Sequence, residues 1–403
     1  MAIQATVQPV DNASPTLHTA NTTDAFAWLA QIMSGHCSAP NERLTTPQLL
    51  ACAHEQGVIS LVDGQLQNIQ SPGAVATTLS HTRPSKEIVD AFTAAARQAA
   101  LISMLQESEA RFVLNILAEV DLPVLLLKGM AVANWAYSSA HLRECGDVDF
   151  LLPTREAAEV LAKRLTDAGY ERLTTSGDLV AYELLCRRPS SELVQVELDI
   201  HWRLSNSPLF ANVFTFDELM ASSITLPQLG PHARGLGLVH SCIHACIHRT
   251  LNLSIGIEDK LKWLYDLELM MASFTPNDWH ALVNLSVNKG IASLVCHALE
   301  AAALVFGRQI PATICTKLQQ AGTRESLDSE RFAQWGYMQR KTFESLPTLR
   351  LRLRWLWQRL FPSNHYLEYL HSGKPLSYQG LVLERLIRGI RRLRQKTLHK
   401  SST

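Results

Sequence analysis

The chain has 403 residues, of which 47% are hydrophobic and 18% charged, so it can bury a sizeable core and form two or three folded units. Lysine plus arginine and aspartate plus glutamate both number 37, so the overall charge gives no argument for a nucleic-acid or membrane partner. The eight cysteines are scattered without a C-x-x-C pair, and neither a signal-peptide pattern nor a run of 18 apolar residues is present. We therefore expect a cytoplasmic protein without a transmembrane segment.

The N-terminal third is expected to be helical. Residues 1–22 are polar and aperiodic, which predicts a flexible tail. Within residues 23–120, Thr46-Pro47 suits the start of a short helix, and the segment from Lys86 to Val120 repeats apolar residues at three- and four-residue steps without Gly or Pro. This region predicts an N-terminal helical unit that ends in one long helix.

Residues 121–225 have the texture of a small α/β unit. The apolar run that ends at Lys128-Gly129 predicts a buried strand and a turn, followed by a helix from Met130 to Tyr137. A second strand is predicted over 147–152, and a helix follows from Thr154 to about Ala168, closed by Gly169. Two further strands are expected over 179–186 and 193–202.

The remainder is predicted to be helical again. Residues 226–345 hold long helical patterns with prolines at the joints, which indicates a helical domain. Residues 346–403 form a basic amphipathic C-terminal region that could bind an anionic partner: RNA, an acidic protein or a lipid surface. A solvated terminal helix is the alternative.

Asp147 and Asp149 are the first pair of candidate catalytic residues. Because side chains alternate along a strand, the two carboxylates share one face, where they repel each other. A hard cation such as Mg²⁺, which prefers carboxylate and phosphate oxygens, would neutralise them. The D-V-D sequence therefore predicts a metal site.

The later strand supplies a third carboxylate. From Val194 to Trp202, apolar residues alternate with Gln195, Glu197, Asp199 and His201, so the strand has one entirely polar face. If it lies beside the D-V-D strand, Asp199 can bridge a metal and take the proton of an acceptor hydroxyl. Glu197 is the alternative for that role.

The chain has, in this order, a strand that ends in a glycine turn at Gly129, the D-V-D strand and a later strand with Asp199. This order resembles the DNA polymerase β-like nucleotidyltransferase superfamily. The segments Leu127-Lys-Gly-Met-Ala131, Gly146-Asp-Val-Asp-Phe-Leu-Leu152 and Leu198-Asp-Ile-His-Trp202 look more closely like a group of bacterial nucleotidyltransferase family proteins, over about residues 90–375. The resemblance implies an α+β fold: a minimal polymerase β-like core between an N-terminal helical segment and a C-terminal helical domain. It also implies transfer of a nucleoside monophosphate, AMP by default, from an NTP to an unknown hydroxyl acceptor (a small molecule, a sugar or an RNA end) with two Mg²⁺ ions.

The resemblance also implies roles for individual residues. Asp147, Asp149 and Asp199 would be catalytic and bind the metal. The residues expected to contact the nucleotide or its phosphates are Lys128, Gly129, Met130, Arg143, Gly146 and Lys260. Those expected to support the site are Glu197, His201 and His244. Arg143 could instead pair with Asp147 or Glu144.

One departure concerns the first turn. The superfamily usually has Gly-Ser there, whereas this chain has Gly129-Met130, and methionine cannot donate a hydroxyl hydrogen bond to phosphate. Lys128 and the free N–H groups of the following helix would compensate. The missing serine is also the one hint of a catalytically decayed nucleotide-binding protein, against which the three carboxylates argue. Nucleotidylation of a protein side chain is the other alternative.

The histidines at 240, 244 and 248, with Cys242 and Cys246 between them, invite a zinc interpretation. Residues four apart stack only approximately on a helix, and the cysteines point to a different face. A helix wall that faces the active site, or core packing, is therefore favoured over zinc.

Overall fold

The computed structural model describes residues 15–36, 38–70, 83–173, 182–188 and 196–361, together with positions 379, 380, 383 and 387. Most of the predicted basic C-terminal region after residue 361 lies outside the described residues, as do the first residues of both late strands. Helix α1 (Pro15–Met33) begins inside the segment 1–22 that was expected to be a tail.

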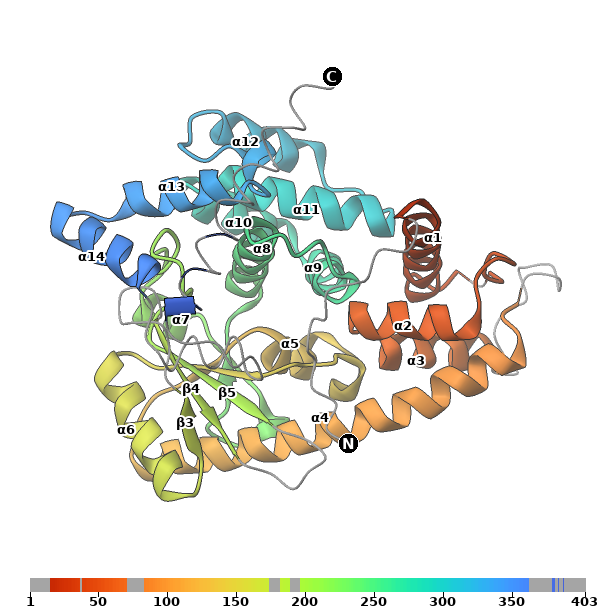
Figure 1. Ribbon diagram of the computed structural model, residues 1–403, viewed down its shortest axis with the longest axis horizontal. Helices are drawn as coiled ribbons and strands as arrows, with labels where there is room; N and C mark the ends of the chain where they lie inside the picture. The colour runs from red at the N-terminus through yellow and green to blue at the C-terminus, as the bar shows by residue number, and fades with distance from the viewer. Residues whose placement is uncertain are drawn as a thin grey trace.

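Four helices form the N-terminal unit (Figure 1). Helices α1, α2 (Thr46–Gln56) and α3 (Ile59–Gln70) pack on the first half of α4 (Lys86–Glu119) around a core that includes Trp28 and Phe92. Ser85 caps α4 by accepting a hydrogen bond from the backbone of Ile88 at 3.4 Å. The predicted long helix is therefore confirmed.

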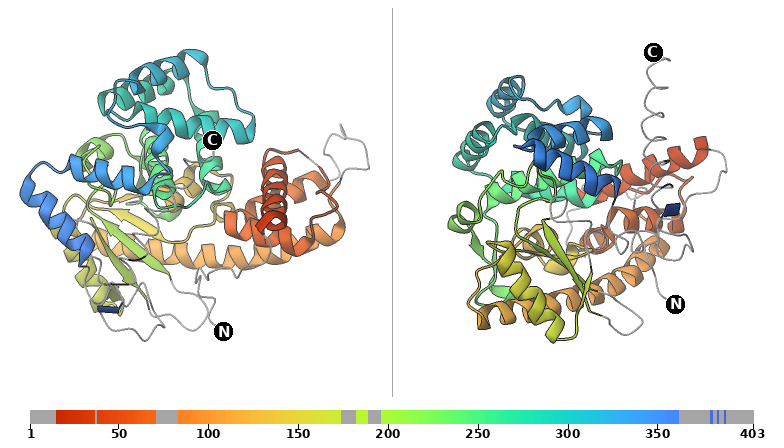
Figure 2. Two further views of the ribbon diagram at one scale, coloured as in Figure 1. Left: turned by 45° about the horizontal axis from the view of Figure 1, so that its top comes forward. Right: turned by 60° about the vertical axis from the view of Figure 1, so that its left-hand side comes forward.

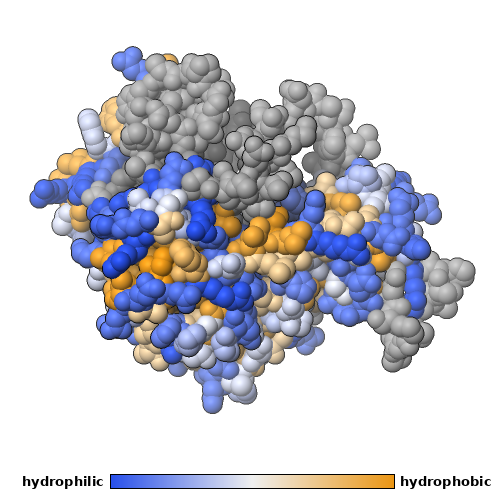
Figure 3. Space-filling model, turned by 90° about the horizontal axis from the view of Figure 1, so that it is seen from below, coloured by the Kyte–Doolittle hydropathy of each residue, from blue (hydrophilic) through white to orange (hydrophobic). Residues whose placement is uncertain are grey.

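Helix α4 contributes side chains to two hydrophobic cores. Its first half belongs to the N-terminal core, and its second half packs Val113, Leu114 and Leu117 against the sheet. By length and composition alone it could cross a membrane, but one face of each half packs on the protein. Between them, four of its apolar side chains are exposed: Leu101, Ile102, Met104 and Leu105. Seen from below, hydrophobic patches alternate with hydrophilic rows on this side of the molecule (Figure 3).

The sheet has seven strands in the order β3-β4-β5-β2-β1-β7-β6. The strands are β1 (Leu125–Leu126), β2 (Val148–Leu151), β3 (Glu171–Leu173), β4 (Glu183–Arg187), β5 (Glu197–His201), β6 (Ile224–Thr225) and β7 (Arg234–Gly235). β2 pairs in parallel with β5 and antiparallel with β1, while β1 pairs in parallel with β7. The predicted mixture of helices and strands is thus confirmed as an α+β architecture.

Two helices connect the central strands. Helix α5 (Lys128–Ala136) follows β1, and α6 (Arg155–Asp167) follows β2. Thr154 caps α6 by accepting from the Ala157 backbone, and Gly169 follows with a φ of 90°. Both helices were predicted, and so were parts of β1, β2, β4 and β5. The short strands β3, β6 and β7 were not predicted, and β7 extends the sheet past residue 225, the expected end of the core.

The described residues after β5 are mainly helical, apart from the short elements on either side of α7 (Phe216–Ala221). Its helices are α8 (Leu238–Ser254), α9 (Leu261–Ser273), α10 (Pro276–Asn288), α11 (Ala292–Phe306), α12 (Ala312–Gly322), α13 (Trp335–Ser345) and α14 (Leu349–Leu360). They lie above the sheet, and α14 is at the outer edge (Figures 1 and 2). One core runs from β1 and α5 into α8–α11, so the sheet and the helices share their apolar packing.

A buried ion pair joins the loop before β2 to α9. Arg143 Nε and Nη2 donate to the two carboxylate oxygens of Asp266 at 2.9 and 2.8 Å, and Tyr137 Oη donates to the same carboxylate at 2.7 Å. Arg143 and Asp266 are 6% and 5% exposed. Arg143 therefore pairs with α9, not with the carboxylates of Asp147 or Glu144 that the sequence offered as partners.

This pair generates a stability prediction. Asp266→Ala would leave the Arg143 guanidinium buried without its counter-charge, so we expect the free energy of unfolding to fall by about 3–5 kcal/mol. Asp167→Ala, which removes the exposed i,i+4 pair with Lys163, is the control and should cost less than about 1 kcal/mol. Urea unfolding monitored by circular dichroism measures both. Equal losses in the two variants would contradict the structural role of the pair.

Candidate functional site

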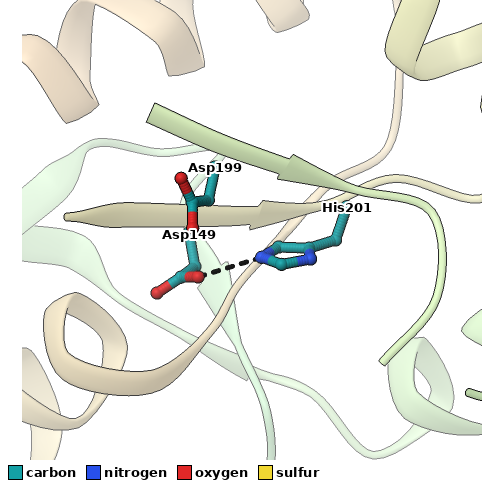
Figure 4. A group of neighbouring side chains, drawn as sticks. All are labelled: Asp149, Asp199 and His201. Carbon is teal, nitrogen blue, oxygen red and sulfur yellow. Dashed lines mark hydrogen bonds and ion pairs between the residues drawn. The ribbon is translucent and has the colours of Figure 1, made fainter. Parts of the chain in front are cut away.

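The parallel pairing of β2 with β5 creates the site. In its register Asp149 lies opposite Asp199, and Leu151 lies opposite His201. Because alternate residues of a strand share a face, the side chains of Asp149, Asp199 and His201 project from the same side of the sheet (Figure 4). Leu198 and Ile200 of β5 point the other way, into the core against α6.

Asp149, Asp199 and His201 form a tight group. One ligand atom from each lies within 4.8 Å of the others, and His201 Nε2 is 2.9 Å from Asp149 Oδ1 (Figure 4). Asp149 and His201 are 1% and 2% exposed, whereas Asp199 is half-buried. His201 Nδ1 is 3.4 Å from a carboxylate oxygen of Glu183 on β4, a residue that the sequence analysis did not single out.

The negative charges of the neighbouring carboxylates repel one another. Burial, and then the charges of Asp149 and Asp147, raises the pKa of Asp199 well above its ordinary value. The charge of Asp149, followed by burial, also raises the pKa of Asp147. Positive charge near these carboxylates would therefore stabilise their ionised forms.

Lys128 supplies part of that charge. Its Nζ donates to Asp149 Oδ1 at 2.5 Å. Burial alone would raise the pKa of Asp149, but Lys128 and His201 outweigh it and hold the pKa below the ordinary value. Lys128 is also one of two non-glycine residues with positive φ among those described, at 47°, in the turn between β1 and α5. Such a conformation is costly for a side-chain-bearing residue and is typical of functional turns.

Gly129 follows in the same turn for a steric reason. A Cβ atom added there would lie 2.8 Å from Cys145 Sγ and 3.4 Å from Arg143 Nη1. The glycine thus lets the start of α5 approach the segment before β2 closely. Met130, in contrast, is 3% exposed and packs in the core beneath the sheet. Its side chain therefore contacts apolar neighbours.

The group fits a divalent cation. Asp149 and Asp199 offer the oxygen ligands that hard cations prefer, and their mutual repulsion would be relieved by one. Asp147 lies outside the tight group, in the bend immediately before β2, while His201 lies inside the group. Glu197 is also outside it. A metal at this position would therefore be held by Asp149 and Asp199, with Asp147 or His201 alongside.

A cavity of about 240 Å³ meets this group at Lys128 and Asp147, whereas Asp149, Asp199 and His201 do not line it. One wall is formed by the β1–α5 turn and the segment 143–147, and the other by α8 and the start of α9. The predicted residues that line it are Lys128, Gly129, Arg143, Gly146, Asp147, His244 and Lys260. Its other polar or aromatic lining residues include Cys145, Ser241, His248, Lys262 and Trp263.

Lys260 and Lys262 give this cavity a cationic side. Lys260 Nζ lies 5.8 Å from the centre of the Trp263 ring. Burial, and then the charge of Arg143, lowers the pKa of Lys262, so its ammonium would gain from an anion in the cavity. The sequence analysis missed Lys262, although the Lys-x-Lys pattern before the apolar stripe of α9 was a usable signal.

The histidines of α8 do not gather into a metal site. His244 and His248 line the cavity, whereas His240 lies 2.9 Å from Ser222 and packs on Phe214. Burial, followed by the charge of Lys128, lowers the pKa of His244 to about 3, so its imidazole is neutral. In the part of the chain that the structure describes, the group able to hold a metal does not include these residues. The zinc interpretation has no support.

Comparison with known proteins places the chain in a family. A family model described as "Uncharacterised nucleotidyltransferase" matches residues 43–307, which include the N-terminal helices from α2, the whole sheet and α8–α11. The comparison with curated proteins gave no match. The matched range contains all three carboxylates and every residue that lines the cavity. The chain therefore belongs to this family and is a nucleotidyltransferase.

Proposed function

We propose that the cavity binds the triphosphate of an NTP and that the adjoining carboxylates direct transfer of the nucleoside monophosphate to a hydroxyl acceptor, with release of pyrophosphate. The observation that carries the proposal is that Asp149 and Asp199 lie on paired strands, and that Asp149 contacts Lys128, one of three lysines on the walls of the cavity. This arrangement separates a metal-binding edge from an anion-binding pocket. Phosphoryl-transfer sites combine these two elements.

The triphosphate would be held from both walls. Lys128 approaches from the β1–α5 turn, and the first N–H groups of α5 add the positive end of a helix. Lys260 and Lys262 approach from the start of α9. Trp263 and His248, whose rings meet edge-to-face at 5.1 Å, offer an aromatic surface for the nucleoside. Arg143 is committed to Asp266, so in this proposal it supports the pocket wall instead of binding phosphate.

The carboxylates would act at the other end of the pocket. When bound, two Mg²⁺ ions would neutralise the phosphate charge and favour loss of the acceptor's proton. Asp147 and Asp149 would hold the triphosphate end, and Asp199, on the neighbouring strand, would orient the acceptor hydroxyl and draw its proton. His201 would fix the Asp149 carboxylate through its 2.9 Å contact. A polymerase β-like core and ATP as donor are part of this proposal by resemblance.

The first prediction separates capture from transfer. Asp149→Asn should lose Mg²⁺-dependent NTP binding, while Asp199→Asn should still bind NTP and transfer at least ~10²-fold more slowly. Single-turnover transfer of label from each NTP, with host lysate fractions as the acceptor source, measures the rate; melting temperature with and without Mg-NTP measures binding. Asp90→Asn, at an exposed position of α4, is the control.

The outcomes of this experiment distinguish the alternatives. Label on a small molecule, sugar or RNA end supports the proposal, whereas label on protein identifies a side-chain acceptor. Mg-NTP binding by the wild type without transfer to any fraction would indicate a decayed binding protein. If Glu197→Gln abolishes transfer and Asp199→Asn does not, the third carboxylate is misplaced.

The second prediction uses Gly57, the C-cap of α2, to displace Lys262. A Cβ at Gly57 would lie 2.6 Å from Lys262 Cδ and 3.0 Å from its Nζ, so alanine must push this flexible side chain away. We expect Gly57→Ala and Lys262→Met each to weaken NTP binding by about tenfold, because a charged hydrogen bond to phosphate would be lost.

Gly307→Ala is the matched control for this substitution. Gly307 caps α11 with a φ of 69°, close to the 65° of Gly57, but a Cβ there would meet nothing within 4 Å. Both alanines carry the same backbone strain, so both should lower the melting temperature. Only Gly57→Ala should alter the affinity measured by calorimetry. Equal affinities in the two variants would show that Lys262 does not contact the nucleotide.

A further inference from the structure

Helix α14 presents an apolar stripe that no described part of the chain covers. Its sequence, LRLRLRWLWQRL, contains four arginines and no acidic residue. Leu349, Leu353 and Trp357 are 68%, 58% and 65% exposed, and Leu356 and Leu360 are exposed with them. The helix follows α13 at the outer edge of the molecule in Figure 1 and comes forward in the right-hand view of Figure 2.

The arrangement around the helix axis has three sectors. At about 100° per residue, the five exposed apolar side chains fall within an arc of roughly 100°. Arg350 and Arg354 lie on one flank of this stripe, and Arg352 and Arg359 on the other. The opposite sector packs on the protein, where Trp355 is 4% exposed and contacts Phe343 of α13.

The flanking arginines are partly fixed by the fold. Arg352 donates to the Leu346 and Glu344 carbonyls at 2.9 and 3.1 Å, and the Arg359 guanidinium lies 5.2 Å from the centre of the Trp355 ring. These contacts orient α14 on α13 and leave the positive charges beside the apolar stripe. The stripe is therefore a fixed feature of the surface and not a frayed helix end.

The C-terminal part of the chain that contains α14 is strongly basic, whereas the rest is acidic. Residues 346–403 hold 12 of the 37 lysines and arginines but only two of the 37 aspartates and glutamates. This end thus carries a formal charge of +10 and residues 1–345 carry −10, although the chain as a whole is neutral. Such an asymmetry would turn the α14 end toward an anionic surface and the rest of the molecule away from it.

We propose that α14 docks on an anionic lipid bilayer, with its leucines and Trp357 inserted at the headgroup boundary and its arginines among the lipid phosphates. An apolar stripe that contains tryptophan and is flanked by arginine is the pattern of helices that lie in a membrane interface. Nucleic acid would satisfy the arginines but leave the stripe in water. Association of two α14 helices would bring eight arginines close together, and their positive charges would repel each other.

The test uses the full chain and vesicles of phosphatidylcholine, with or without phosphatidylglycerol. Sedimentation should show binding to vesicles that contain phosphatidylglycerol, little binding to phosphatidylcholine alone, and weaker binding as salt is raised. The double variant Leu353→Gln/Trp357→Gln should reduce partitioning into vesicles at least ~10-fold, because two of the apolar side chains that would insert into the bilayer are lost. The double variant Arg350→Gln/Arg354→Gln should weaken vesicle binding at low salt and make the binding less dependent on salt.

Leu304→Gln is the matched control, because Leu304 is 86% exposed on α11, outside the stripe. It should bind vesicles as the wild type does. Three results would overturn the proposal: no binding to anionic vesicles, equal binding by the stripe variant and the Leu304→Gln control, or binding to an RNA oligonucleotide but not to vesicles. Light scattering adds a fourth, since a wild-type dimer that the stripe variant converts to monomer would assign α14 to self-association.

Discussion

The parallel contact between β2 and β5 determines whether a site exists at all, because it sets which side chains share a face. Asp149 lies opposite Asp199, and a shift of one residue in this register would turn the Asp199 carboxylate into the core that Leu198 and Ile200 occupy. The register is held by the burial of those apolar neighbours. The carboxylates themselves oppose it, since the charge of Asp149 raises the pKa of Asp147, and the charges of Asp149 and Asp147 raise the pKa of Asp199. The core thus imposes a repulsive arrangement that a bound cation would relieve, as the proposed function requires.

Much of the fold could be predicted from the sequence, because the signals were local. The long pattern of α4, Thr154 and Gly169 around α6, and the alternation of β5 each appear within a few neighbouring residues. The strands β3, β6 and β7 were missed because two or three residues carry no period, and β7 also pairs with β1, which is remote in sequence. Domain limits drawn from composition also ended the core before β7.

The group of two carboxylates and a histidine was predictable because its residues lie on patterned strands. Asp149, Asp199 and His201 follow from the alternation of β2 and β5, and the structure brings them together. Arg143 was assigned to phosphate because a cation near an acidic motif suits that role; its pairing with Asp266, 123 residues away, leaves no local trace. Lys262 was missed for the converse reason, since its place in the cavity depends on how α9 packs. Gly129 and Met130 were read by analogy with a phosphate turn, whereas their environments show close packing against Cys145 and burial in the core.

The N-terminal helices, which supply no carboxylate, nevertheless hold the cavity in shape. Gln56 Oε1 accepts a hydrogen bond from the Leu261 backbone at 2.9 Å, and so caps the start of the helix that carries Lys262 and Trp263. On the other wall, the Glu144 carboxylate accepts from the Ser60 backbone at 3.0 Å, at the start of α3. One helical unit therefore binds both walls, the segment before β2 and the beginning of α9, at points close to the buried Arg143–Asp266 pair. These two hydrogen bonds fix the positions of the two walls relative to the N-terminal helices, so they are placed to set the width of the cavity in which we propose that the triphosphate binds.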